Sequence, residues 1–272
     1  MLHETHAGHV TPASDKVFYV FYDFETSQNN EYADETNLHV PNLVCVQQFC
    51  SRCEKVEDVC DCVRCGIRKH SFWQHPVGEL LSYLTEPRPW GNKLITIAHN
   101  AKAVDLHVIL NRAILLKLKP DLIRNGLKIM CMRMEHLMFL DSVSFLPFPL
   151  RKLPEAFRLT ATNSCYAHYF NTEENFDNIG HFPDHSYYRV NEMSEEERSE
   201  FLEWYEYQGP PFDKRGLLEQ YCQDYVTVLN NACPVFRREF MQLGKLDVFL
   251  ESIIIASACN KVLRKLFCSP IL

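Results

Sequence analysis

The sequence predicts an α/β protein in which a mixed β-sheet is flanked by helices and interrupted by a small cysteine-rich insertion. Strand-like segments with interposed helices fill the first half of the chain, and helices dominate the second half. Two Cys-x-x-Cys pairs fall within the strand region. The chain has 272 residues, 46% of them hydrophobic, which suits a globular protein with a buried core.

Strands are expected where β-branched and aromatic residues are frequent or alternate with polar ones, over 16–24, 42–50, 93–100, 126–135 and 136–145. Helical spacing of apolar residues predicts helices over 77–84, 102–117, 194–208, 215–233, 235–243 and 249–267. Ser194 and the three glutamates after it are typical of a helix start. The polar and aromatic stretch 160–192 is expected to be a long loop.

Composition excludes several classes of protein. With 28 basic and 35 acidic residues the net charge is −7, which argues against a broadly cationic nucleic-acid-binding surface. A local basic groove stays possible, and the last predicted helix carries Lys261, Arg264 and Lys265. No run approaches the roughly 18 apolar residues of a membrane helix, and the N-terminus lacks a secretory signal. We therefore expect an intracellular protein, nuclear or cytoplasmic, with no membrane partner and with its 12 cysteines reduced.

The cysteine pairs predict a structural zinc site. Cys50-x-x-Cys53 and Cys62-x-x-Cys65 can supply four thiolates in tetrahedral geometry, and Gly66 suits the tight turn of a zinc knuckle. Cys60 could replace Cys62 as a ligand. The alternative is a loop of free thiols, which the paired spacing disfavours. A site with four thiolates leaves no open position on the metal, so its role would be structural.

Asp23 and Glu25 follow a predicted core strand and, one residue apart, point to the same face of it. Such a pair alone is usually a solvated strand end. Further polar stretches change this interpretation, with His99, Asn100 and Asp105 at a strand end and helix start, and Tyr221 and Asp224 in a late helix. Carboxylates collected in this way can hold two Mg²⁺ or Mn²⁺ ions about 3.5–4 Å apart, which would activate a water for phosphodiester cleavage.

With these motifs the chain resembles the exonuclease domain of family B DNA polymerases, in the protein-primed branch of viruses, organellar plasmids and Polinton elements. The resemblance covers roughly residues 15–265, and residues 139–157 are similar to a further stretch of that branch, D-S-x-x-x-L-P-x-P-L. The motifs match here, in chain order, at Asp23 and Glu25, at His99, Asn100 and Asp105, and at Tyr221.

The resemblance implies a ribonuclease-H-like fold and 3′→5′ proofreading of a primer end or single-stranded DNA. It implies Asp23, Glu25 and Asp105 as magnesium ligands, and Tyr221 as the residue that positions the attacking water or the phosphate. It also implies His99, Asn100 and Ser142 as DNA contacts. No palm-domain motif of a polymerase occurs, so we expect a tail over 1–15, an exonuclease-like domain over 16–245 with the knuckle at 48–68, and a helix over 246–272 leading toward an absent palm.

The chain departs from that pattern at two positions. Val104 stands where the second motif has an aromatic residue, which would pack against the primer strand. The third motif is Tyr-x-x-x-Asp, but the fourth residue after Tyr221 is Tyr225, and the acid is Asp224. One helical step rotates a side chain by 100° and moves its root by roughly 5 Å, more than magnesium coordination tolerates. We therefore expect a weakly held metal and an impaired nuclease.

Simpler roles compete with several of these assignments. His99 and Asn100 could cap the following helix, Asp141 could be a turn residue, and Tyr221 could pack against Tyr225 in the core. The alternative function is a catalytically inactive module, derived from a mobile element, that binds single-stranded DNA or a protein.

Overall fold

The computed structural model describes residues 17–33, 36–50, 53, 61–88, 93–160, 165–209 and 211–267. The expected N-terminal tail, residues 51–52 and 54–60 of the knuckle insertion (Cys60 among them), and residues 268–272 lie outside the described residues.

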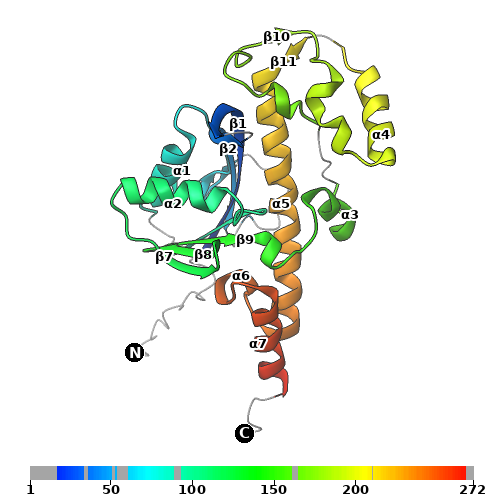
Figure 1. The fold of residues 1–272 in the computed structure, drawn as a ribbon. Coiled ribbons are helices and arrows are strands. Elements are labelled where there is room, and N and C mark those ends of the chain that lie inside the picture. Colours follow the sequence, from blue (N-terminus) through cyan, green and yellow to red (C-terminus); the bar gives the residue numbers. More distant parts are fainter. Residues whose placement is uncertain are drawn as a thin grey trace, which may run out of the picture.

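A mixed sheet of seven strands forms the centre of the molecule (Figure 1). The parallel neighbours are β1 with β6 and β6 with β9, and the other neighbouring pairs are antiparallel. The strands lie in the spatial order β5 (Lys69–Phe72), β2 (Thr36–Cys50), β1 (Val17–Ala33), β6 (Lys93–Ala98), β9 (Leu137–Asp141), β8 (Lys128–Met134) and β7 (Asp121–Asn125). This confirms the predicted mixed α/β sheet and is consistent with a ribonuclease-H-like fold.

Helices pack on both faces of the sheet (Figure 1). Neighbouring residues of a strand point to opposite faces. Gln47 of β2 donates to Thr227 Oγ1 of α5 (Lys214–Gly244), whereas Gln48 accepts from the hydroxyl of Tyr83 in α1 (Pro76–Thr85). The long helix α5 therefore covers one face, and α1, with α2 (Asp105–Leu115) beside it, covers the other.

Ser194 caps α4 (Glu195–Glu206) as the sequence predicted. Its hydroxyl accepts from the Glu197 amide, and the Glu197 carboxylate accepts from the Ser194 amide, which completes a capping box. The remaining short helices are α3 (Leu153–Phe157), α6 (Val248–Glu251), α7 (Ile255–Phe267), η2 (Ser142–Ser144) and η3 (Leu150–Lys152).

The expectation of a long loop over 160–192 was wrong for the described part of that segment. Aromatic side chains give residues 165–213 a small core of their own, centred on Ala167, Tyr188 and Phe201, separate from the core around the sheet. Burial of these rings orders the chain into η4 (His168–Phe170), η5 (His185–Tyr188), η6 (Val190–Glu192) and a ribbon of β10 (Ile179–Gly180) with β11 (Phe212–Asp213). We call residues 165–213 the aromatic segment.

Two predicted helices, 215–233 and 235–243, form one continuous helix, α5. Pro234 lies inside it and is buried. Tertiary packing along the sheet therefore outweighs the hydrogen bond that proline cannot donate. The predicted helix over 249–267 divides instead into α6 and α7.

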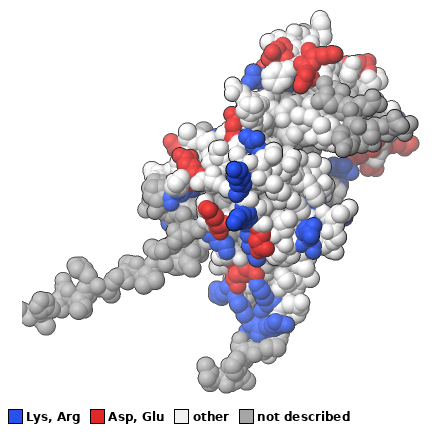
Figure 2. All heavy atoms as spheres, turned by 60° about the vertical axis from the view of Figure 1, so that its left-hand side comes forward, with Lys and Arg blue, Asp and Glu red and all other residues white. Residues whose placement is uncertain are grey.

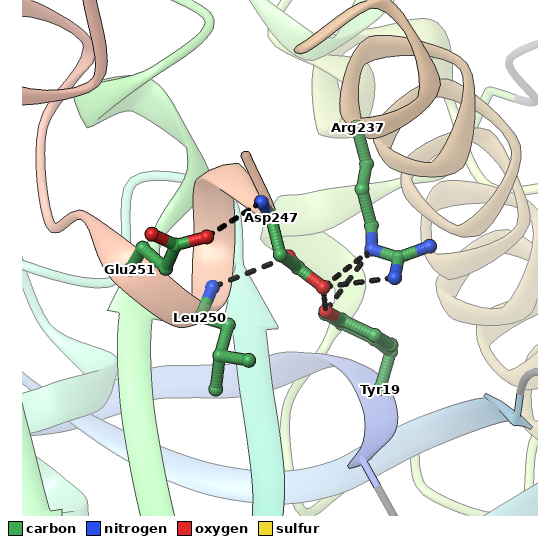
Figure 3. Close-up of polar contacts among 5 residues, drawn as sticks. All are labelled: Tyr19, Arg237, Asp247, Leu250 and Glu251. Carbon is green, nitrogen blue, oxygen red and sulfur yellow. Dashed lines mark hydrogen bonds and ion pairs between the residues drawn. The ribbon is translucent and has the colours of Figure 1, made fainter. Parts of the chain in front are cut away.

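A buried ion pair fastens the C-terminal helices to the sheet (Figure 3). The Arg237 guanidinium of α5 lies 2.8 Å from Asp247 Oδ2, which also accepts from the Tyr19 hydroxyl of β1 at 2.6 Å. Asp247 Oδ1 accepts from the Leu250 amide and so caps α6. The three side chains satisfy one another away from water, which joins β1, α5 and α6.

None of the helices in the described ranges is both long and apolar enough to cross a membrane. On the face in Figure 2, acidic and basic side chains are interspersed over most of the surface. Basic side chains gather toward the C-terminal end, where α7 carries Lys261, Arg264 and Lys265. Lys265 lies 3.8 Å from the Glu251 carboxylate, so this cluster is partly neutralised.

Candidate functional site

A cavity of about 270 Å³ opens beside β1, between the sheet, α5 and the aromatic segment. Asp23 and Glu25 line it together, as expected for alternate residues of one strand. Phe24 and Thr26 of β1 line it too, and the other lining residues come from five further parts of the chain: His39, His99, Leu150, His168, Arg189, Tyr221 and Tyr225. We call this cavity the acid pocket.

Glu25 is buried and Asp23 is half-buried, and the charge of each carboxylate is poorly solvated. Burial, the Glu25 carboxylate and Asp105 raise the pKa of Asp23 well above its usual value. Burial is also the main reason why the pKa of Glu25 rises to about 8. Oxygens of both acids and the thiol of Cys222 lie within 4.8 Å of one another, close enough to share one metal ion. A cation in the pocket would relieve the repulsion that these groups exert on one another.

Asp105 begins α2 and contributes to the same electrostatic environment. Its carboxylate raises the pKa of both Asp23 and Glu25, and burial raises its own pKa to about 7. It does not line the acid pocket and is absent from the group within 4.8 Å. Val104, at the N-cap of α2, supplies no side-chain cap. The structure thus brings Asp105 near the pair without closing a three-acid cluster.

The loop after β6 is organised by Asp141, which is fully buried at the end of β9. Its carboxylate accepts from the amides of Asn100, Lys102 and Val143 at 2.9–3.2 Å. These bonds hold Asn100 in the left-handed region, with φ of 63°. Asp141 is therefore the buried support of this loop rather than a simple turn residue.

Two of the three predicted DNA contacts touch each other. His99 Nδ1 lies 2.9 Å from Ser142 Oγ, and His99 lines the acid pocket. Asn100 and Ser142 do not line the cavity: Ser142 is buried beside His99, and Asn100 is exposed. Burial lowers the pKa of His99, so the ring presents a neutral face to the pocket.

On α5, tyrosines occupy the side that faces the acids. Tyr221 and Tyr225 line the pocket with ring centroids 4.5 Å apart. Burial is the main cause that raises the pKa of the Tyr225 hydroxyl, and Asp23 and Glu25 raise it further. Asp224 lies outside the pocket, where its carboxylate accepts from Gln220 Nε2 at 2.7 Å. Two strand acids and two tyrosines of α5 therefore share the pocket, and Asp224 does not line it.

Four thiols form a second cluster at the end of β2. Cys50 Sγ lies 3.8 Å from Cys53 Sγ and 3.9 Å from Cys62 Sγ, and Cys53 Sγ lies 3.6 Å from Cys65 Sγ. The turn between β3 (Asp61–Cys62) and β4 (Gly66–Ile67) places Gly66 at φ of 75°, a conformation that favours glycine. Hydrogen bonding to Cys50 is the main cause that raises the pKa of Cys53 to about 11. All four sulfurs lie within 4.8 Å, so the cluster can hold a metal ion.

No protein-family model and no curated protein matches the sequence. Solved structures do match. The phi29 DNA polymerase complexed with single-stranded DNA aligns with 93% of this chain at 12% identity and a TM-score of 0.54. The phi29 polymerase with primer-template DNA and incoming nucleotides aligns with 94% at 12% identity and a TM-score of 0.51. This chain has a polymerase-related fold.

The chain spans about a third of the length of the phi29 polymerase (35% in both complexes), so the similarity concerns only that part of the polymerase. A family B DNA polymerase from the archaeon Pyrobaculum calidifontis also matches, with 83% of this chain covered, 25% of that chain, 12% identity and a TM-score of 0.43.

Several residues in or beside the acid pocket carried no signal in the sequence. Cys222 looked like a core residue of the helix stripe, and His168 and Arg189 lie in the stretch read as a loop. His168 Nε2 lies 3.2 Å from the Tyr221 hydroxyl, which links the aromatic segment to α5 beside the acids. No motif spacing relates positions 168, 189 and 222, so only the path of the folded chain brings them together.

His168 predicts an acid-sensitive link in the fold. Burial and the Arg189 cation lower its pKa from 6.5 to about 4, and Glu192 opposes this. The unfolded chain therefore binds a proton at His168 that the folded chain does not, and the contribution of His168 to stability falls as pH drops from about 6.5 to 4. The loss approaches roughly 3 kcal/mol at the acid end of that window. Urea unfolding of wild type and His168→Gln at pH 7 and 4.5 measures it.

The His168→Gln variant should lose less stability on acidification than wild type does. Exposed His185 lies in the same segment, and His185→Gln is the matched control, expected to keep the wild-type dependence on pH. Equal losses for wild type and His168→Gln would contradict the assignment.

Proposed function

We propose that the chain is a metal-dependent 3′→5′ exonuclease module that acts on single-stranded DNA ends and is impaired in cleavage. One observation carries the proposal: carboxylate oxygens of Asp23 and Glu25 lie within 4.8 Å of each other in a pocket that His99 and Tyr221 also line. Buried carboxylates without a paired cation are costly, so this arrangement favours a bound divalent metal. The fold shared with phi29 polymerase supports the same assignment.

In this proposal Asp23 and Glu25 hold the catalytic Mg²⁺ or Mn²⁺, with Asp105 as a further acid that supports the site. The metal would polarise the phosphate and lower the pKa of the attacking water. Tyr221 would orient that water or a phosphate oxygen, and its hydroxyl is held by His168. His99, fixed by Ser142, would contact the strand near its 3′ end, with Asn100 shaping the loop that presents it.

The proposed impairment comes from Tyr225. A phenol whose pKa is raised stays protonated at neutral pH and is a poor ligand for magnesium, which prefers anionic or strongly polar oxygens. The test is degradation of a 5′-labelled single-stranded oligonucleotide by wild type and Tyr225→Asp with Mg²⁺ or Mn²⁺. We expect slow or no cleavage by wild type and faster cleavage by the variant.

The same observation favours a second candidate, a module that binds single-stranded DNA without cutting it. Such a module would retain DNA binding without cleavage, because His99 and Tyr221 still line the pocket while the third acid of the proposed metal site is missing. Binding by wild type together with no cleavage by Tyr225→Asp would favour this candidate.

We also propose that the four-thiol cluster holds one structural zinc ion. Four sulfurs from two Cys-x-x-Cys pairs suit tetrahedral Zn²⁺, and metal binding would deprotonate the thiols. Metal analysis of purified protein should find about one zinc per chain. Cys53→Ser should lower this content and the thermal midpoint, whereas Cys259→Ser, at an exposed cysteine of α7, should change neither. A metal-free preparation that stays fully folded would count against the proposal.

A further inference from the structure

A second cavity, of about 470 Å³, lies within the aromatic segment. Its volume falls in the range of about 300–1,000 Å³ that is usual for small-molecule sites. Arg189 lines both this cavity and the acid pocket, so the two are neighbours across one side chain. We call the second cavity the arginine pocket.

Arg189 lies between the two cavities, so its positive charge is close to both of them. Its backbone adopts φ of 58°, which an L-residue rarely does without constraint from its surroundings. Its guanidinium carbon lies 5.4 Å from the ring centre of Tyr169. Its Nε atom is buried and has no hydrogen-bond partner among the described residues. A buried donor of this kind calls for an acceptor, which a ligand oxygen could supply.

The rest of the arginine pocket combines positive charge with apolar and aromatic surface. Arg198 lines it, and one guanidinium nitrogen donates to the Val190 carbonyl. The guanidinium has no other partner among the described residues. Tyr169 is 50% exposed and Leu202 is 40% exposed, so a ring and an apolar side chain are open to a ligand. The acid there, Glu192, already accepts from the Tyr169 hydroxyl at 2.8 Å.

We propose that the arginine pocket is a subsite for one nucleotide of single-stranded DNA. The base would lie against Tyr169 and Leu202, and its phosphate would contact Arg198 and Arg189. This inference rests on the proposed function: a strand whose 3′ end lies at Asp23 would continue past Arg189, which lines both cavities, into the arginine pocket. Single strands suit it because only an unpaired base exposes a face for stacking.

The test is fluorescence anisotropy of a 5′-labelled oligo(dT), with Ca²⁺ in place of Mg²⁺ so that the strand stays intact. Tyr169→Leu removes the ring and should weaken binding about tenfold without changing its salt dependence. Arg198→Ala should weaken binding and also reduce the slope of log K against log salt by about 0.7, the share of one phosphate. Arg198→Lys keeps the charge and should keep the slope.

Two control variants match these changes outside the pocket. Tyr207 is 82% exposed at the end of α4, and Arg124 is exposed on the edge strand β7. Neither residue lines the arginine pocket, so Tyr207→Leu and Arg124→Ala should bind as wild type does.

Two results would overturn the inference, and they differ in what they say of the proposed function. If wild type binds oligo(dT) and Tyr169→Leu and Arg198→Ala bind equally well, the subsite is wrong and the proposed function stands. If wild type does not bind the oligonucleotide at all, both fail.

Discussion

Replacing Tyr225 with aspartate is expected to raise 3′→5′ degradation of a single-stranded oligonucleotide on the order of a hundredfold, since a misplaced reacting group commonly costs about that much. The substitution puts a carboxylate on the side of α5 that already faces Asp23 and Glu25. In the proposed mechanism three acids would then hold the metal that two would hold weakly. The measurement is the rate of loss of a 5′-labelled strand in Mg²⁺.

Metal binding offers a second readout of the same variant. A third buried acid should destabilise the metal-free Tyr225→Asp chain by repulsion, and Mg²⁺ should restore stability because it binds the folded state alone. The thermal midpoint should therefore rise with Mg²⁺ more steeply in Tyr225→Asp than in wild type.

Three further variants isolate the charge. Tyr225→Asn supplies a polar side chain without the anion and should gain little activity. Asp23→Ala in the Tyr225→Asp background should abolish the gain. Asp224→Asn in wild type should change nothing, because that carboxylate is bonded to Gln220 outside the pocket.

Val104→Phe, in the Tyr225→Asp background, tests whether an aromatic side chain improves binding of the DNA strand. An aromatic side chain at the start of α2 could stack on a base, which is worth about 1–3 kcal/mol. A folded Val104→Phe, Tyr225→Asp double variant with no nuclease activity would show that the acids do not converge on a metal. Strong wild-type activity that Asp224→Asn removes would place Asp224 at the metal instead.

The second large effect is on stability. Arg237→Ala is expected to lower the free energy of unfolding by about 3–5 kcal/mol, because it leaves Asp247 charged and buried without its partner. Asp247 is only 5% exposed, so water cannot replace the lost contact. Urea denaturation measures the change.

An exposed pair provides the comparison. Lys152 and Glu155 lie 3.7 Å apart with most of both side chains in solvent, and Glu155→Gln should cost less than about 1 kcal/mol. The double variant Arg237→Ala, Asp247→Ala should lose less free energy of unfolding than the two single variants lose in sum, because it leaves no unpaired charge. Additive losses would contradict the role of the pair.

The sequence by itself determined the features that depend on local periodicity. Alternation along a strand placed Asp23 and Glu25 on one face, and paired Cys-x-x-Cys spacing brought four thiols together. The resemblance to a Tyr-x-x-x-Asp motif, together with the 100° step of a helix, predicted that Tyr225 rather than Asp224 would lie on the side of the acids; Tyr225 lines the pocket and Asp224 does not. For the strand pair and for each cysteine pair, neighbours within a few residues set the geometry.

Only the tertiary structure decided which distant residues share the sites. His168 and Arg189 reach the acid pocket because aromatic packing orders a segment whose composition reads as a loop. Tyr19 and Asp247 meet across 228 positions of sequence. Such contacts follow from how the helices and the aromatic segment pack on the sheet, and packing depends on complementary shapes that leave no periodic trace in the chain.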